Sequence, residues 1–149
     1  MILTLVPGQI PLATLRSLWA APQAIAVDER ARPAVDGAAA SVAQVIADHR
    51  TVYGVNTGFG LLARTRIDDA RLAELQRALL LSHAAGTGPT LDDAVVRLVL
   101  ALKAASLARG HSGVRWQVIE ALVGLADANV LPCVPSLGSV GASGDLAPL

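Results

Sequence analysis

The chain has 149 residues, a formal net charge of zero and 53% hydrophobic residues, with aromatics making up only 3% of the sequence. This length fits one domain of ordinary size. The neutral balance, with no basic block, argues against a nucleic-acid-binding surface. The one cysteine, Cys133, excludes an internal disulfide and is typical of a reducing compartment. A core of Ala, Leu and Val favours packed helices over a β-sandwich.

The apolar stretches of the chain predict neither a secretion signal nor a membrane span. The N-terminus, MILTLVPGQIPLATLRSLW, has no positive charge before its apolar residues and is interrupted by two prolines and a glycine at 7–11, so it does not fit a signal peptide. The most apolar stretch, residues 94–110, carries Arg97 and Lys103 well inside it, and such charges oppose membrane insertion. We therefore expect a cytoplasmic protein with no membrane partner.

Hydrophobic residues recur at the helical spacing in four segments. In chain order the predicted helices are 37–50 with Asp36 as N-cap, 68–86 with Asp68 as N-cap and Gly86 as stop, 94–109 ended by Gly110, and 113–129 after Ser112. The short connections between them suit antiparallel neighbours. The predicted fold class is all-α, mostly helical, with glycine-rich loops at 51–66 and 130–145.

The two loops contain residues that fit neither a helix nor a regular strand. Residues 51–60, TVYGVNTGFG, include three glycines and an asparagine and predict backbone positions of positive φ. Residues 130–145 hold two prolines and three glycines. Both loops also contain apolar side chains, so we expect them to lie against other parts of the protein. Loops held in this way commonly carry function.

The second loop leads into GSVGASGDLAPL, residues 138–149, which matches none of the common nucleotide or hydrolase loops. No lysine follows its glycines as in a phosphate-binding loop, and glycines at 138, 141 and 144 do not have the dinucleotide-loop spacing. The GASG segment also lacks the spacing of a hydrolase nucleophile elbow. We therefore expect no nucleotide cofactor, and no spacing of His, Cys, Asp and Glu indicates a metal site.

Three small residues, Ala142, Ser143 and Gly144, permit a different chemistry. A sharp bend can bring the Gly144 nitrogen onto the carbonyl carbon of Ala142, because glycine leaves that nitrogen unhindered. Attack with loss of one water closes a five-membered ring. Loss of the Ser143 hydroxyl as a second water then leaves an exocyclic alkene, which is an electrophile. Asp145 is either a proton carrier for these steps or the N-cap of a helix that begins with Leu146-Ala147-Pro148.

The segment GSVGASGDLAPL resembles the signature of the ammonia-lyases that carry a 4-methylidene-imidazol-5-one (MIO) electrophile. Residues 53–60, YGVNTGFG, are similar to the second signature of that family. Two further segments, LSHAAGTG at 81–88 and RGHSGVR at 109–115, resemble its histidine-specific branch. The resemblance extends from about Tyr53 to the end of the chain.

The resemblance implies a role for each matching position. Ala142, Ser143 and Gly144 would form the MIO by internal cyclisation, with Ser143 supplying the methylidene carbon. Tyr53 would be the base that removes the β-proton of the substrate, or a close partner in that step. Gly60 would present its backbone to the reacting amine or to the MIO oxygen.

Ser82 and His83 carry the implied substrate specificity. His83 would contact the side chain of the substrate, since relatives that act on phenylalanine or tyrosine have a different pair at these positions. The resemblance thus implies non-oxidative deamination of L-histidine to trans-urocanate and ammonia. It also implies a homotetramer whose active sites combine residues of three subunits. Residues 1–149 would then be an N-terminal domain, truncated before the central helical bundle and inactive by itself.

Other interpretations are open from the sequence. Another MIO enzyme, a phenylalanine or tyrosine ammonia-lyase or an aminomutase, would share the same signature. A hydrolase-like site would use Ser143 as nucleophile with His83 or His111 as base, and a non-catalytic helical module would use none of these residues chemically. We expect His49 and His111 to be structural or surface residues, and Asn56 to hold the turn of the first loop.

Overall fold

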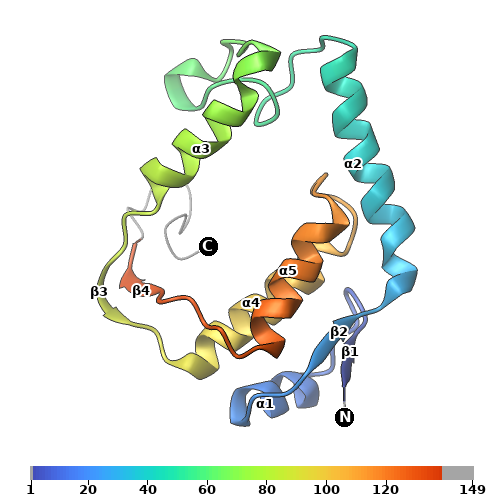
Figure 1. Ribbon diagram of the computed structural model, residues 1–149, viewed down its shortest axis with the longest axis vertical. Coiled ribbons are helices and arrows are strands. Elements are labelled where there is room, and N and C mark those ends of the chain that lie inside the picture. Colours follow the sequence, from blue (N-terminus) through green and yellow to red (C-terminus); the bar gives the residue numbers. More distant parts are fainter. Residues whose placement is uncertain (1, 139–149) are drawn as a thin grey trace. The chain divides into compact units, whose positions relative to one another are not determined.

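The computed structural model describes residues 2–138 and divides into two compact units (Figure 1). Unit 1 combines Met1–Ser41 with Leu91–Cys133, and unit 2 combines Val42–Thr90 with Val134–Leu149. Each unit is therefore built from segments that are far apart in the sequence. The chain is mostly helical, as predicted, with short strands in both units.

Unit 1 begins with a small β–α–β arrangement. The strands β1 (Leu3–Leu5) and β2 (Ile25–Val27) pair in parallel, with Leu3 opposite Ile25, and the helix α1 (Leu12–Ala20) connects them. Strands of three residues are too short to produce a recognisable alternation, so the sequence pattern did not predict them. The pattern also missed α1, which begins directly after a proline that the sequence analysis treated as an interruption.

Two helices complete unit 1 and supply most of its core. In Figure 1, α4 (Asp93–Leu107) and α5 (Trp116–Asp127) lie side by side, and both contact β2. The buried side chains form two clusters, one of Leu5, Leu18, Ile25, Leu100, Ala101 and Ala126, the other of Val27, Val35, Ala104, Ala108, Trp116 and Ile119. The Ala-, Leu- and Val-rich composition therefore builds a helical core, as expected.

The start of α2 (Arg32–Ala47) corrects the first predicted helix. Asp36 does not cap it but lies inside it, with its carboxylate 3.6 Å from Nε of Arg32. The capping carboxylate is instead Asp28, which accepts a hydrogen bond from the backbone nitrogen of Arg30 and opens the short turn before α2. Pro33 is compatible with this earlier start, because a missing N–H costs nothing in the first turn of a helix.

The end of α2 also differs from the prediction, because the chain turns at His49 and does not continue helically to Arg50. His49 has a φ of 55°. Its nitrogen donates to the carbonyl of Ile46, and the nitrogen of Arg50 donates to that of Val45. This is the Schellman pattern, in which the left-handed position normally favours glycine. Asn129, with a φ of 51°, ends α5 in the same way, close to the predicted position.

The helix α3 (Leu72–His83) lies in unit 2. The carboxylate of Asp68 accepts from the nitrogen of Ala70 at 2.9 Å and caps the turn that leads into α3, so the predicted cap is confirmed. The helix ends at His83, three residues before the predicted stop at Gly86. Gly86 serves a different purpose, since a Cβ there would lie 2.9 Å from the Cβ of Pro135.

The strands β3 (Thr87–Thr90) and β4 (Pro135–Leu137) form an antiparallel pair in unit 2. The second predicted loop therefore contains a strand. The short 3-10 turns of the described chain are η1 (Glu29–Ala31), η2 (Gly60–Leu62) and η3 (Asp69–Arg71). The predicted third helix is confirmed as α4, and Gly110 follows it with a φ of 73°.

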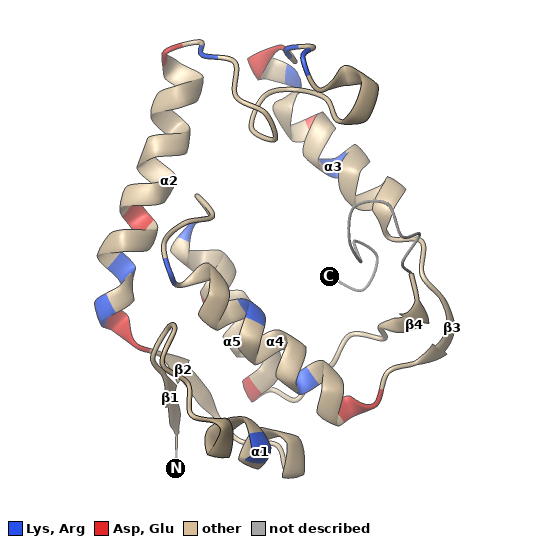
Figure 2. Ribbon diagram, turned by 180° about the vertical axis from the view of Figure 1, so that it is seen from behind, with Lys and Arg blue, Asp and Glu red and all other residues tan. Residues whose placement is uncertain are grey.

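Charged residues of both signs are distributed along the chain (Figure 2), and most of α4 and α5 is uncharged. Glu29, Arg32 and Asp36 form ion pairs around the start of α2. Within residues 2–138, no helix combines the length and the apolar character that crossing a bilayer demands.

Candidate active site

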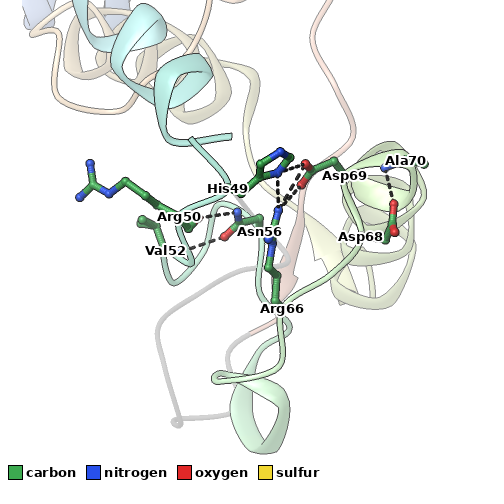
Figure 3. A network of polar contacts seen from close by, with 8 residues as sticks. All are labelled: His49, Arg50, Val52, Asn56, Arg66, Asp68, Asp69 and Ala70. Carbon is green, nitrogen blue, oxygen red and sulfur yellow. Dashed lines mark hydrogen bonds and ion pairs between the residues drawn. The ribbon is translucent and has the colours of Figure 1, made fainter. Parts of the chain in front are cut away.

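The loop after α2 folds around the buried side chain of Asn56. Its Oδ1 accepts from the backbone nitrogen of Val52 at 2.9 Å, and its Nδ2 donates to the carbonyl oxygen of Arg50 at 2.8 Å (Figure 3). The backbone oxygen of Asn56 also accepts from the nitrogen of Ile67 at 2.8 Å. Both ends of the amide hold the turn, so the expected structural role of Asn56 is confirmed.

Two neighbours of Asn56 close the loop. Thr57 is buried and forms an isolated antiparallel bridge with Arg66. The nitrogen of Gly58 donates to the carbonyl of Thr65 at 3.1 Å. A Cβ at Gly58 would lie 2.5 Å from the Cβ of Leu62, closer than side-chain atoms approach each other. Glycine is therefore required there by packing, and the loop returns on itself within a few residues.

The predicted site residues Tyr53 and Gly60 lie on this loop. Tyr53 is 63% exposed, and its ring meets that of Phe59 edge-on, with centroids 5.6 Å apart and planes at 62°. Gly60 has a φ of 56°, and within residues 2–138 no atom beyond its chain neighbours lies within 4 Å of the place where a Cβ would stand. The predicted positive φ is thus confirmed at Gly60 and also at Gly54. Both Tyr53 and the backbone beside Gly60 are open to an incoming molecule.

Ser82 and His83 end α3 with their side chains exposed and in mutual contact. The Nδ1 of His83 lies 2.8 Å from the carbonyl oxygen of Leu79 and 3.1 Å from Oγ of Ser82. Because a carbonyl oxygen only accepts, Nδ1 carries the proton in this hydrogen bond. In the neutral ring this assignment leaves Nε2 as an acceptor. The Ser82 hydroxyl donates to the same Leu79 oxygen at 3.0 Å, which fixes the pair on the helix end.

The structure brings the predicted residues together in two groups. Tyr53 and Gly60 share the loop before α3, whereas Ser82 and His83 lie at the far end of that helix, and no hydrogen bond recorded within residues 2–138 joins the groups. The remaining predicted residues, Ala142, Ser143, Gly144 and Asp145, lie outside the described residues. Within the described chain, no three His, Cys, Asp or Glu side chains are grouped for metal binding.

A polar cluster that the sequence analysis did not identify joins the two ends of the loop (Figure 3). Nδ1 of His49 lies 3.2 Å from Oδ2 of Asp69 and 3.1 Å from Nη2 of Arg66. The same Nη2 donates to Oδ1 of Asp69 at 3.1 Å. These side chains line a shallow pocket together with Ile67 and Asp68. His49 was expected to be a structural or surface residue. No sequence motif connects it with Asp69, which lies twenty residues later.

A family model described as aromatic amino acid lyase matches residues 10–149. Among curated proteins, the chain is 56% identical over 148 residues to the histidine ammonia-lyase of Salmonella arizonae. It is 55% identical over 147 residues to the enzyme of the same name from Salmonella typhimurium. These matches cover 99% of the chain, which spans 29% of the length of either relative.

Solved structures of lyases and aminomutases have the same fold over nearly the whole of this chain. The histidine ammonia-lyase of Trypanosoma cruzi superposes with a TM-score of 0.84 at 32% identity, covering 100% of this chain and 28% of that one. Ergothionase from Treponema denticola gives a TM-score of 0.92 at 25% identity, covering 99% of this chain and 29% of that one. Tyrosine aminomutase from Streptomyces globisporus gives 0.90 at 26% identity, covering 99% and 28%. The chain therefore belongs to the aromatic amino acid lyase family.

Proposed function

We propose that the full-length protein containing this chain deaminates L-histidine non-oxidatively to trans-urocanate and ammonia, and that residues 1–149 are its N-terminal domain. The observation that carries this proposal is the 56% identity with a histidine ammonia-lyase over 99% of the chain. Over the same stretch the aminomutases match at only 26% to 28%, and this difference supports a histidine-directed enzyme.

The pair Ser82–His83 supports histidine as the substrate. The hydrogen bond from Nδ1 of His83 to Leu79 holds the ring in one orientation and leaves Nε2 free to accept from a substrate. An imidazole substrate offers an N–H donor, whereas the ring of phenylalanine offers none. A polar pair held by the backbone of α3 therefore favours a nitrogen-containing ring over a purely apolar one.

Ala142, Ser143 and Gly144 provide the residue types that an internally formed MIO requires, because no side chain in this run is larger than a hydroxymethyl group. When formed, the MIO supplies an electrophile of a kind that no unmodified side chain offers. Asp145 follows directly and would carry a proton or cap the next helix.

The loop residues would act on the substrate from the first described loop. Tyr53, exposed beside Phe59, would take the β-proton on its phenolic oxygen. Gly60, with open space beside its Cα, would present backbone groups to the substrate amine. Asn56 would position both residues, since its amide bonds to the backbone of Arg50 and Val52 before Tyr53. Its backbone oxygen accepts from Ile67, which follows Gly60 in the chain.

Exposed apolar side chains support assembly into a homotetramer. Leu61, Leu62, Leu80, Leu81 and Leu137 of unit 2 are each more than half exposed. Exposed leucines of this number are consistent with a contact with other polypeptide. In the proposed enzyme, the rest of the chain and neighbouring subunits would cover it, and the assembly would act in the cytoplasm.

Urocanate and ammonia production by the purified full-length protein tests the proposal. L-histidine is expected to be turned over, and L-phenylalanine and L-tyrosine are not. The intact mass should be lower than the encoded mass by two waters. The Ser143→Ala variant should have its full encoded mass and only background turnover. An active enzyme with its full encoded mass contradicts the proposed cofactor, and preferential turnover of phenylalanine or tyrosine contradicts the proposed substrate.

The substitution His83→Leu separates specificity from chemistry. We expect kcat/KM for histidine to fall roughly tenfold to a hundredfold, the value of one hydrogen bond between polar partners in a closed site. The mass deficit should remain, because His83 takes no part in ring formation. The isolated 149-residue chain should be inactive, since catalysis depends on the assembled geometry.

A further inference from the structure

We propose that the hydroxyl of Thr57 is a positioning group that sets the paired rings of Tyr53 and Phe59. Its hydrogen bonds are features of the described structure. Its relevance to catalysis rests on the proposed function, because that function makes Tyr53 the base.

The side chain of Thr57 is buried and bonded on two sides. Thr57 is 1% exposed. Its Oγ1 donates to the carbonyl oxygen of Gly58 at 2.9 Å and accepts from the backbone nitrogen of Gly54 at 3.3 Å. A hydroxyl has one hydrogen and two lone pairs, so it makes both bonds at once. The direction of each bond is fixed, because a carbonyl only accepts and an N–H only donates.

The two bonded groups belong to the peptide units that flank the aromatic residues. The nitrogen of Gly54 lies in the peptide unit that follows Tyr53, and the carbonyl of Gly58 lies in the unit that precedes Phe59. A peptide unit is planar, and its orientation is set by the two dihedrals beside it. The Thr57 hydroxyl therefore restricts ψ of Tyr53 and φ of Phe59 together.

The glycines at these two places make the restraint important, because glycine changes its backbone conformation more easily than other residues. Gly54 has a φ of 78°, and within residues 2–138 a Cβ there would meet no atom of another segment. Packing thus does not hold Gly54. Gly58 is held at its nitrogen by the carbonyl of Thr65, whereas its own carbonyl is held by Thr57.

The direction of the Tyr53 ring depends on this restraint. Tyr53 is more than half exposed, so burial does not fix its ring. The ring meets Phe59 edge-on, in the geometry that aromatic pairs favour. The orientation of Tyr53 is therefore set by its own backbone and by Phe59, and Thr57 restrains both. The backbone bridge between Thr57 and Arg66 anchors the hydroxyl in turn.

Thr57 holds a different part of the loop from its neighbour Asn56. The Asn56 amide bonds to Arg50 and Val52, which both precede Tyr53, and so closes the base of the loop. The Thr57 hydroxyl bonds inside the loop, between the two aromatic residues. Loss of the Asn56 amide should loosen the whole loop, whereas loss of the Thr57 hydroxyl should release the ring pair within a loop that remains closed.

Three variants isolate the hydroxyl. Thr57→Val keeps the branched shape and removes both hydrogen bonds, whereas Thr57→Ser keeps the hydroxyl. The matched control is Thr65→Val, the same substitution at an exposed position of the same loop. Thr65 contacts Gly58 through its backbone oxygen, which the substitution retains.

The ring contact can be measured directly, because Tyr53 and Phe59 are the only tyrosine and the only phenylalanine of the 149-residue chain. We expect a nuclear Overhauser signal between the two labelled rings in the parent, in Thr57→Ser and in Thr65→Val. In Thr57→Val the signal should be at least about twofold weaker, since the restraint of the hydrogen bonds is lost. The indole signals of Trp19 and Trp116 show whether each variant is folded.

Turnover of the full-length protein then separates positioning from general support. In Thr57→Val we expect kcat for histidine to fall about tenfold to a hundredfold, because a displaced base acts poorly. KM should change less than about twofold, since removal of the β-proton belongs to the transition state. Rates are counted per molecule that shows the two-water mass deficit, which excludes loss of formed cofactor as the cause. Thr57→Ser should recover most of the parental kcat.

A ring signal lost in Thr57→Val and kept in Thr57→Ser and Thr65→Val supports the proposal. A folded Thr57→Val with the parental signal, a folded parent without a signal, or equal loss in the valine and serine variants overturns it. A weakened ring contact with unchanged kcat overturns the catalytic role. The ring signal needs no turnover, so its result stands apart from failure of the proposed function.

Discussion

The interactions that stabilise unit 1 internally differ from those that stabilise unit 2. In unit 1, Leu5, Val35, Val96 and Ile119 are almost fully buried, and burial of apolar area stabilises the unit. In the described part of unit 2, the most deeply buried side chains are polar, Asn56 and Thr57, and no residue of α3 is buried.

The difference shows why the candidate site residues lie in unit 2. The loop with Tyr53 and Gly60 takes its shape from hydrogen bonds between Asn56 and the backbone. These directional bonds fix the path of the backbone without a large apolar core. Its apolar surface remains available for other parts of the enzyme. Unit 1 has its own apolar core, whereas unit 2 presents shaped backbone and exposed side chains.

The strongest test of this comparison removes apolar volume from each unit. Ile119→Ala in unit 1 should lower the free energy of unfolding by about 2–5 kcal/mol, because a buried isoleucine leaves a cavity. Leu80→Ala, on the exposed face of α3, should change it by less than about 0.5 kcal/mol. Urea unfolding followed by circular dichroism reports on both units, because unit 1 contains α4 and α5 and unit 2 contains α3. Equal losses in the two variants would remove the distinction between the units.

A polar deletion should have the next largest effect, confined to unit 2. Asn56→Ala leaves the nitrogen of Val52 and the carbonyl of Arg50 without their partner, and the loss of two part-buried hydrogen bonds costs about 1–3 kcal/mol together. We expect faster tryptic cleavage at Arg64, in the exposed part of the loop. Tryptophan fluorescence should report an unchanged unit 1. Cleavage at the parental rate would show that Asn56 does not hold the loop.

Two glycines of unit 1 test how closely the surrounding atoms are packed, one in a crowded position and one in an open position. Gly110→Ala should destabilise unit 1 by about 1–2 kcal/mol from its φ of 73° alone. A further cost comes from a Cβ that would lie 2.8 Å from the Cβ of Ala34. Gly37→Ala, inside α2, should stabilise by about 0.5–1 kcal/mol, because the added Cβ would meet no atom of another segment within 4 Å in the described part of the chain. Thermal unfolding should show a lower melting temperature for Gly110→Ala and a higher one for Gly37→Ala. A change in the same direction in both variants would contradict the described packing.

The smallest expected effect depends on pH. Hydrogen bonds from the Arg30 side chain and backbone lower the pKa of Asp28 from 3.8 to about 2. A carboxyl whose pKa is lower in the folded state contributes stability above its unfolded pKa, and this contribution is lost as the pH falls through about 2. Arg30→Ala should therefore lower the melting temperature slightly at pH 6, and the difference from the parent should shrink toward pH 2. A difference that grows on acidification would refute the assignment.

The sequence by itself determined the elements whose signals are local. Helical periodicity predicted the segments that become α3, α4 and α5, and the Asp68 cap and the turn at Asn129 occur where side-chain chemistry places them. Glycines predicted positive φ at 54 and 60. Two separate motifs, one around Ser143 and one in the loop with Tyr53, indicated the family. Each is contiguous in the chain and can therefore be recognised from the sequence alone.

Only the tertiary structure decided the features that depend on distant segments. Asp28 and Pro33 start α2 earlier than Asp36 suggested, because the chain enters the helix directly from β2. Gly86 proved to be a point of close approach to Pro135, 49 positions along the chain, and not a helix stop. The contact of His49 with Arg66 and Asp69 likewise appears only when the loop folds back on itself. Spacing along a chain specifies local hydrogen bonds, whereas contacts across a loop are fixed by the path of the backbone between them.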